Sequence, residues 1–361
     1  MTPASPPIGA KSIPALSTPA LMVDLDVFEA NVAAMVSLLS GTGKTVRPHV
    51  KTHRTPELAR RQLGGSVSGL TCATVGEAEA MVDAGLDDVF VANEVVDPAK
   101  IARLVSLAHR ARISIAVDDA EPVAVLSRVA AAAGVTVDVL IDMDILLHRC
   151  GVASPQDAIA LARRIEDLPG LRLRGVMGYE GRLRLTDKDR AGKIGRAYQI
   201  LADTASALRS AGFQVDVVSA AGTSTLIEAL ADPTITEIQA GVYALMEPEL
   251  LIMDLPFRCA AVLRGTVISR HPGRIVTDVG RRVVGMEYGA PIPVGLAVKG
   301  IRVSDEHSTL IMDDPLPPLG SWVDLTPGQI RTTFNLHDHV WVTRGGEIVD
   351  QWPITARGSS Q

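Results

Sequence analysis

The sequence predicts an α/β protein in which a (β/α)8, TIM-like barrel is followed by an all-β domain. Three observations favour this class. Between residues 45 and 241, β-rich runs alternate with Ala/Leu/Arg stretches of helical periodicity, in eight strand–helix repeats. The glycine-rich first turn that opens many doubly wound sheets is missing from the sequence. After Pro248 helical periodicity vanishes, and Pro-Gly, Gly-Gly and Asp-Pro turns separate short alternating runs.

Each barrel strand is expected where a β-rich run precedes a helical pattern. In chain order the expected strands are Thr45–Lys51, Gly69–Thr74, Asp88–Ala92, Arg112–Val117, Val137–Asp144, Leu173–Tyr179, Gln214–Ser219 and Ile235–Gly241. The helical patterns between them include Glu77–Ala84, Pro98–Ala111, Pro122–Ala133, Gln156–Glu166 and Arg190–Ser210.

The β domain is expected to use both ends of the chain. Its later strands are Ala260–Ser269, Arg274–Asp278, Leu296–Val303, Ser308–Met312, Trp322–Leu325, His339–Arg344 and Glu347–Pro353. The early strand Ala20–Leu25 precedes the first barrel helix, Val27–Leu39, and is expected to pair into this domain. We therefore assign residues 26–248 to the barrel, and residues 1–25 with 249–361 to the β domain.

Composition excludes several classes of protein. The chain has 361 residues, 47% of them hydrophobic, which allows a large core and more than one domain. A net charge of −6 without a long basic block argues against a nucleic-acid partner. No apolar stretch reaches the length of a membrane span, and Met1–Pro14 lacks the apolar core of a secretory signal. Cys72, Cys150 and Cys259 are odd in number and widely spaced, which suits a reducing cytoplasm.

The run Arg47–His53 is the strongest candidate for a functional site. It places Lys51 among an arginine and two histidines at the end of the first expected strand. Neighbouring cations disfavour the ammonium form, and a lowered pKa is what a Schiff-base lysine requires. A solvated charge on the barrel rim is the alternative for Lys51. His53, two residues further on, would share the face of the strand. It is our candidate for proton transfer, and a structural hydrogen-bonding role is the alternative.

This run, Arg-Pro-His-Val-Lys-Thr-His, resembles the pyridoxal-phosphate lysine motif of the D-threonine aldolase and D-serine dehydratase-like family. These are fold type III enzymes with an alanine racemase-like barrel. Further similar segments cover essentially the whole chain: Thr18–Leu21, Cys72–Ala78, Asp278 with Gly280, Ser304–His307 and Trp352-Pro353. The resemblance implies that Lys51 binds pyridoxal 5'-phosphate, that the substrate is a small molecule, an amino acid, and that the protein is a homodimer.

Two segments near the middle of the barrel also resemble the family. Asp142 and Asp144 end the fifth expected strand and would both point inward, where they need cationic partners. The nearby Arg149 resembles the family arginine that faces the phenolic oxygen of the cofactor; otherwise it would be a surface arginine. Tyr179, in Gly178–Gly181, resembles an aromatic residue beside the cofactor, and core packing is its alternative.

The loops after the seventh and eighth strands are the usual phosphate-binding loops of such barrels. Ser219–Thr225 is rich in glycine and hydroxyl groups, and a helix is expected to begin near Thr223. A Ser/Thr-rich loop is also a common helix cap. The resemblance adds the expected cofactor contacts in the two loops: Ser219, Gly222, Thr223, Gln239, Ala240, Gly241 and Tyr243.

The chain departs from the family at the metal site of the β domain. The family's ligands come from a Pro-Asn-His-x-Cys or Pro-Asn-His-x-Asp motif that precedes an Asn-Leu pair. Here Gln329 stands at the histidine position and Arg331 at the thiol or carboxylate position. A guanidinium cannot bind a cation, so we expect no metal site of this kind. His337 and His339 would share a strand face and are an alternative ligand pair.

The function expected from this resemblance is a lyase that cleaves a β-hydroxy amino acid, D-configured or α-substituted, by a retro-aldol reaction without metal. Lys51 would form the Schiff base, His53 would be the base, and Arg331 would orient the substrate. A racemase or epimerase and a β-eliminating dehydratase are the alternatives within the fold. A pyridoxal-phosphate carrier without turnover is an alternative from another class. The sequence leaves the substrate and its stereochemistry open.

Overall fold

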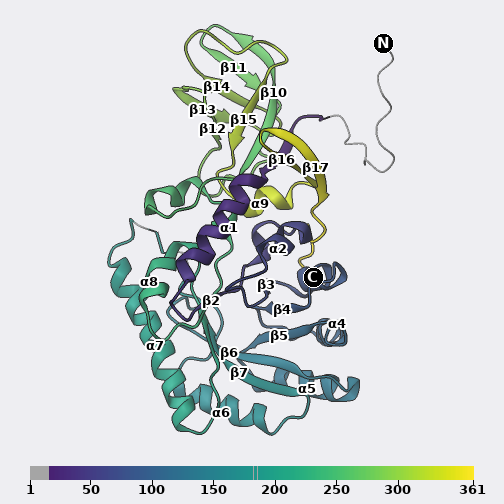
Figure 1. The fold of residues 1–361 in the computed structure, drawn as a ribbon, viewed down its shortest axis with the longest axis vertical. Helices are drawn as coiled ribbons and strands as arrows, with labels where there is room; N and C mark the ends of the chain where they lie inside the picture. The colour runs from purple at the N-terminus through teal and green to yellow at the C-terminus, as the bar shows by residue number, and fades with distance from the viewer. Residues whose placement is uncertain (1–15, 182, 185) are drawn as a thin grey trace.

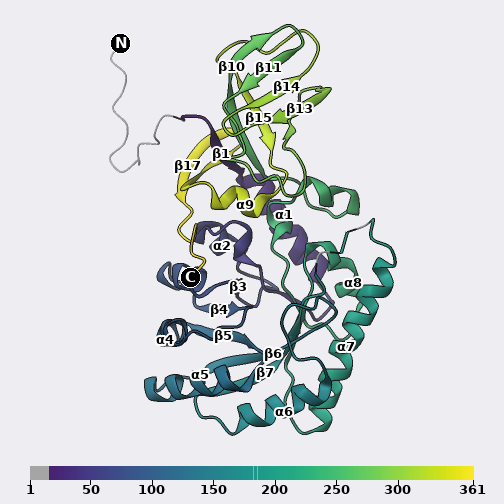
Figure 2. The ribbon, with the colours of Figure 1, turned by 180° about the vertical axis from the view of Figure 1, so that it is seen from behind.

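The computed structural model describes residues 16–181, 183–184 and 186–361. The segment Met1–Pro14, and with it most of the N-terminal stretch assigned to the β domain, lies outside these residues. A barrel lobe and a smaller β-rich lobe are stacked along the long axis of the molecule (Figure 1). The view from behind shows the same division, with the helices α4, α5, α6 and α7 around the outside of the barrel lobe (Figure 2). None of the helices in the described part of the chain has the length and apolar character of a membrane span.

The barrel sheet has eight strands in the order β2-β9-β8-β7-β6-β5-β4-β3, and every neighbouring pair is parallel. The two end strands are linked by the bridges Val46↔Val67 and His49↔Thr71, so the sheet curls back on itself. The strands are β2 Thr45–Val46, β3 Leu70–Cys72, β4 Asp88–Val91, β5 Arg112–Val117, β6 Val137–Met143, β7 Leu171–Gly178, β8 Val217–Ala220 and β9 Glu237–Ile238. The predicted barrel is confirmed.

The barrel helices begin at side chains that satisfy free backbone N–H groups. Thr74, Asp97, Asp119 and Ser154 each accept hydrogen bonds from the first turn of the helix that follows. The predicted helices are present, the helix expected near Thr223 is a 3-10 turn followed by α8, and the short helix α2 was not predicted. Their bounds are α1 Leu25–Leu39, α2 Pro56–Gln62, α3 Val75–Asp83, α4 Pro98–Leu107, α5 Ala120–Ala133, α6 Pro155–Glu166, α7 Arg190–Ser210 and α8 Leu226–Ala231.

The second sheet joins the two ends of the chain. β1 (Ala20–Asp24) lies between β10, to which it is antiparallel, and β16, to which it is parallel. The predicted pairing of the early strand is therefore confirmed. The other strands are β10 Ala261–His271, β11 Arg274–Thr277, β12 Ile292–Pro293, β13 Gly300–Val303, β14 Ser308–Ile311, β15 Trp322–Thr326, β16 His339–Arg344 and β17 Glu347–Pro353. The domain boundary at residue 248 stays a prediction.

Two local predictions were wrong. The region after Pro248 is not purely β, because the helix α9 (Ile330–Asn335) interrupts it. The first barrel strand ends at Val46 and not at Lys51. The chain turns instead through the 3-10 helix η1 (Val50–Thr52), and the amides of His53 and Arg54 both donate to the carbonyl oxygen of Val50. This turn decides which side chains of the motif reach the site.

Candidate active site

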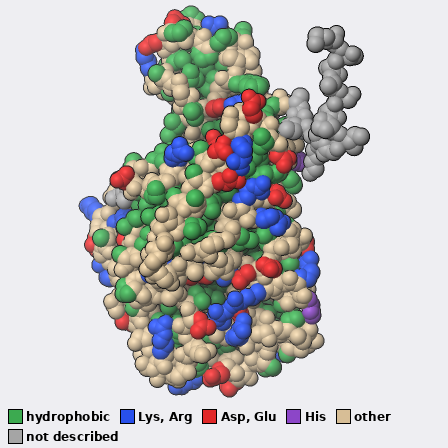
Figure 3. Space-filling model, in the orientation of Figure 1, with side chains coloured by type: hydrophobic (Ala, Val, Ile, Leu, Met, Phe, Trp, Pro, Cys, Tyr) green, Lys and Arg blue, Asp and Glu red, His purple; other side chains and the backbone are tan. Residues whose placement is uncertain are grey.

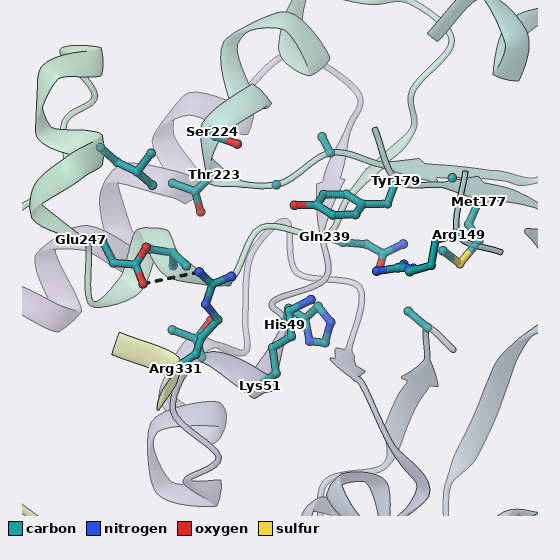
Figure 4. Close-up of a pocket in the computed structure, with 18 residues that line it drawn as sticks. His49, Lys51, Arg149, Met177, Tyr179, Thr223, Ser224, Gln239, Glu247 and Arg331 are labelled. Carbon is teal, nitrogen blue, oxygen red and sulfur yellow. Dashed lines mark ion pairs between the residues drawn. The ribbon is translucent and has the colours of Figure 1, made fainter. Parts of the chain in front are cut away.

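A pocket opens where the barrel strands end and the β-rich lobe begins. Its lining comes from η1, the loops after β6, β7, β8 and β9, the segment before β10, and α9 (Figure 4). Catalytic sites of such barrels lie at this end of the strands. The predicted site residues that line it are Lys51, Arg149, Tyr179, Gly222, Thr223, Gln239, Gly241 and Arg331.

Lys51 lies in η1 at the floor of the pocket. Burial and the positive charges of Arg331, Arg149 and Arg54 lower its pKa from 10.5 to about 8, and Glu77 opposes them. Its Nζ atom lies 6.0 Å from the centre of the Tyr179 ring. Within the described residues, Nζ has no hydrogen bond or ion pair. A useful fraction of this amine is therefore unprotonated near neutral pH, as a nucleophile requires.

His49 also lines the pocket, and we did not predict it as a site residue. The residue is buried, its Nδ1 atom has no hydrogen-bond partner, and the backbone of Thr71 partly offsets the lowering of its pKa by burial. The residue belongs to the same motif as Lys51, two positions earlier. Its position in the motif could have indicated a site residue, but we predicted His53 instead.

His53 does not line the pocket, which corrects its predicted role as the base. Its Nε2 lies 2.9 Å from Oε1 of Gln62, and its Nδ1 accepts a hydrogen bond from the Thr55 amide. Burial lowers its pKa to about 4, so the ring is neutral. The prediction assumed a strand, in which residues 51 and 53 would share a face. The 3-10 turn abolishes that alternation and sends the two side chains apart.

Two loops carry the features expected of a phosphate site. Gly222, Thr223 and Ser224 line the pocket at the start of the 3-10 helix η2 (Thr223–Thr225), which leads into α8. The first turn of such a helix offers N–H groups to an anion. Gly241 follows β9, and a Cβ atom there would lie 2.5 Å from the His49 carbonyl oxygen and the Thr52 hydroxyl. Only glycine lets this loop approach the lysine turn so closely.

Three of the predicted cofactor contacts do not line the pocket and lie behind these loops, so their contact with the cofactor stays a prediction. The Ser219 hydroxyl donates to Glu237, and Ala240 is fully buried. The Tyr243 ring is buried against Phe257, and its hydroxyl accepts a hydrogen bond from Gln62. The Tyr243 amide donates to the hydroxyl of Thr223, which ties the two loops together.

Arg149 lines the pocket on the side opposite Arg331 (Figure 4). Asp142 points inward as predicted, and burial together with Glu94 and Asp118 raises its pKa to about 8. Asp144 does not point inward, because β6 ends at Met143. Its carboxylate accepts hydrogen bonds from the amides of Leu146 and His148 and so closes the loop.

The wall formed by α9 carries the residues that replace the expected metal ligands. The Gln329 side chain caps the helix by accepting a hydrogen bond from the Thr332 amide. The Arg331 guanidinium donates to the Tyr288 hydroxyl at 2.9 Å and lies 3.7 Å from Oε1 of Glu247. Neither Glu247 nor its contact with Arg331 was predicted.

The alternative ligand pair is not formed either. His337 lies before β16 and bonds the carbonyl oxygen of Val283, whereas His339 is exposed on the strand. In the part of the chain that the structure describes, no three His, Cys, Asp or Glu side chains group closely enough to hold a metal ion.

The pocket suits a cofactor that carries an aldehyde, an aromatic ring and a phosphate. Lys51 supplies an amine with a lowered pKa, Tyr179 and His49 line the cavity, and the two glycine loops offer an anion site. Arg149 supplies a positive charge on the far side. These residues fit pyridoxal phosphate.

Comparisons with known proteins agree with this fit. The family model described as alanine racemase, N-terminal domain, matches residues 23–247, and that of a putative serine dehydratase domain matches residues 260–343. A D-threonine aldolase of Arthrobacter sp. is 36% identical over 356 residues, which cover 96% of this chain and 94% of that protein. A 3-hydroxy-D-aspartate aldolase of Paracoccus denitrificans is 31% identical, with 95% and 92% covered.

Solved structures give the same result. The D-threonine aldolase of Filomicrobium marinum superposes with a TM-score of 0.90 at 35% identity, covering 96% of this chain and 97% of that one. The D-threo-3-hydroxyaspartate dehydratase of Delftia sp. HT23 gives a TM-score of 0.80 at 25% identity, covering 94% and 97%. An alanine racemase of Clostridium difficile, at 14% identity and a TM-score of 0.76, shares the fold.

Proposed function

The chain belongs to the D-threonine aldolase and D-serine dehydratase-like family of fold type III pyridoxal-phosphate enzymes, and on that premise we propose that it is a retro-aldol lyase. Its substrate is a β-hydroxy amino acid that is D-configured or carries an α-substituent. The observation that carries this proposal is Lys51, an amine of lowered pKa in a pocket between Arg149 and two glycine loops. The aldolases among its relatives support the reaction type.

The roles proposed for the lining residues follow from their chemistry. Lys51 would bind the aldehyde carbon of the cofactor, and the loops at Gly222 and Gly241 would hold the phosphate. The positive charge of Arg149 would favour the ionised phenolic oxygen. The bound cofactor supplies an electron sink for a bond broken at Cα of the substrate.

We propose further that the reaction runs without a divalent metal. The carboxamide of Gln329 is engaged by the Thr332 amide, and Arg331 places a fixed positive charge where a cation would be repelled. Arg331 instead orients the substrate, because a guanidinium binds a carboxylate or a hydroxyl oxygen well.

Aldehyde release tests the proposal. The purified holoenzyme is incubated with D-threonine, 3-hydroxy-D-aspartate and α-methyl-β-hydroxy amino acids, with and without EDTA, and its metal content is measured. We expect aldehyde from at least one substrate, no effect of EDTA, and no activity in Lys51→Ala. Stoichiometric zinc or manganese together with loss of activity in EDTA would refute the metal-free reaction.

Racemisation or β-elimination is the second candidate. The change at Gln329 and Arg331 favours racemisation, since chemistry that breaks only the Cα–H bond does not require activation of a hydroxyl group, whereas β-elimination must still expel hydroxide. Deuterium incorporation with loss of optical activity and no aldehyde would select a racemase, and ammonia with a keto acid would select a dehydratase. Cofactor absorbance without turnover of any amino acid would indicate a carrier.

We also propose a cytoplasmic homodimer. The three cysteines are free. The 3-10 helix η4 (Pro248–Met253) carries exposed Leu251 and Ile252 beside the pocket-lining Leu250. Apolar side chains also gather on the upper part of the barrel lobe in Figure 3. An apolar surface at the mouth of a site is a common place for a second subunit. Light scattering of the purified protein tests the oligomeric state.

A further inference from the structure

His49 lines the pocket with a ring that makes no hydrogen bond within the described residues. The residue is 7% exposed, and its Nδ1 atom is buried without a partner, so Nε2 is the ring nitrogen that is accessible from the cavity. The backbone of Thr71 favours the protonated ring, which suits an N–H on the buried Nδ1. The lone pair of the neutral ring then lies on Nε2, the nitrogen that a substrate can reach.

The surroundings keep this imidazole unprotonated. Burial lowers the pKa of His49 well below its ordinary range, and the positive charges of Lys51, Arg331 and Arg54 lower it further. Figure 4 shows the ring beside Lys51, with Arg331 on one side and Arg149 on the other. A neutral base in a cluster of fixed cations is well suited to take a proton from a neutral hydroxyl, because the alkoxide that develops is stabilised by the same cations.

Three other ionisable residues are less suitable as this base. Glu247 contacts Arg331 and accepts a hydrogen bond from the Ile330 amide, so its carboxylate is already used. Lys51 binds the cofactor until the substrate releases it, and is then assigned the delivery of the proton to Cα. His53 lies outside the pocket with both ring nitrogens engaged.

We propose that His49 is the catalytic base that removes the proton from the β-hydroxyl group of the substrate, a role that rests on the proposed lyase function. The hydroxyl proton moves to Nε2, and the O–H electron pair becomes the second C–O bond of the released aldehyde. The Cα–Cβ bond breaks, and its electron pair stays on Cα. Lys51, which the incoming substrate ammonium group would release from the cofactor as an ammonium ion, then protonates Cα. His49 returns its proton to the amino group of the departing amino acid, so both residues are restored and the reaction needs no other reactant.

His49→Gln tests this role, because glutamine keeps a polar side chain of similar length in the same place but cannot act as a base. Two reactions are measured on the holoenzyme: aldehyde release from the best β-hydroxy amino acid, and exchange of the glycine α-proton with deuterium by NMR. Exchange uses Lys51 and the cofactor but requires no hydroxyl deprotonation. We expect His49→Gln to slow aldehyde release by about 100- to 10,000-fold and to leave exchange within about threefold of the wild type.

His53→Gln is the matched control, since it changes the second buried histidine of the same motif. It should leave the ratio of aldehyde release to exchange unchanged, whatever it does to stability. Added imidazole should restore part of the aldehyde release in His49→Ala, because a small base can enter the space left by the ring.

Several outcomes would overturn the proposal. Aldehyde release that persists within about tenfold of the wild type in His49→Gln would show that another base acts. An equal loss of both reactions, without rescue by imidazole, would show that the residue only supports the lysine turn. A wild-type protein that exchanges the glycine proton but releases no aldehyde from any substrate would refute the lyase function itself, and the two failures are thereby distinguished.

Discussion

Replacing Arg331 with glutamine should raise the pKa of Lys51 and slow its reaction with the cofactor. The pKa of Lys51 falls from 10.5 to about 8, first through burial and second through the charge of Arg331. A shift of that size corresponds to about 3 kcal/mol against the ammonium form. Glutamine keeps much of the side-chain bulk without the charge, so we expect the pKa to rise by about one unit, or ~1.4 kcal/mol, a plausible share for one charge at an effective dielectric constant of about 20.

The assay is the rate at which the apoenzyme reacts with pyridoxal phosphate, followed by stopped-flow absorbance from about pH 6.5 to about pH 10. Only the unprotonated amine attacks the aldehyde, so the rate follows the neutral fraction of Lys51. A rise of one unit from a pKa of about 8 lowers that fraction roughly eightfold at about pH 7.5. The midpoint of the pH profile should move upward by the same amount as the pKa, about one pH unit.

Arg331→Lys is the control, because it keeps the positive charge and changes the shape. It should leave the midpoint close to that of the wild type, although its hydrogen bond to Tyr288 is altered. The electrostatic reasoning fails if Arg331→Gln does not move the midpoint, or if Arg331→Lys moves it equally.

Three further predictions concern the surroundings of the site. Gly241→Ala should weaken cofactor binding at least about tenfold, because its Cβ atom would lie 2.5 Å from two oxygen atoms of the lysine turn. Gly195→Ala is the control and should leave binding unchanged, because nothing lies within 4 Å of its Cβ atom. Equal binding of the cofactor by both variants would contradict the prediction. Glu77→Gln should lower the free energy of unfolding by about 2–3 kcal/mol in urea titrations by leaving a partly buried arginine without its carboxylate. It should also lower the pKa of Lys51, the reverse of Arg331→Gln. Ile252→Lys should shift the protein toward monomer in light scattering, and a wild-type monomer would disprove the dimer.

The fold could be predicted where each element is long enough to show its period. The strand Arg112–Val117 and the helix Arg190–Ser210 were predicted with the bounds that the structure gives. The helix Ile330–Asn335 was missed, because six residues span less than two turns and leave no measurable periodicity. Short elements of this kind are decided by caps and tertiary packing, here by the side chain of Gln329.

The sequence predicted which segments form the site, but not which side chains of the lysine motif reach it. Topology alone placed Arg149 and the loops at Gly222 and Gly241 around one pocket. The choice between His49 and His53 depended on whether the chain after Val46 stays extended, and a single 3-10 turn reversed it. Glu247 could not be found from sequence, because its contact with Arg331 joins segments that have no local relation.

The charges of the pocket explain why a base can take over what a metal does elsewhere in the family. Lys51, Arg149 and Arg331 place three cationic side chains around the cavity, against one carboxylate, Glu247, in the described lining. A divalent ion added to this set would meet repulsion from the guanidinium at the ligand position. The same excess of positive charge favours the cofactor phosphate, the substrate carboxylate and a developing alkoxide. In the proposed metal-free reaction, Arg331 would stabilise the developing alkoxide in place of a Lewis acid, without binding the hydroxyl tightly enough to ionise it. The proton would then leave to a base, and His49, which lines the same cavity, is the proposed one.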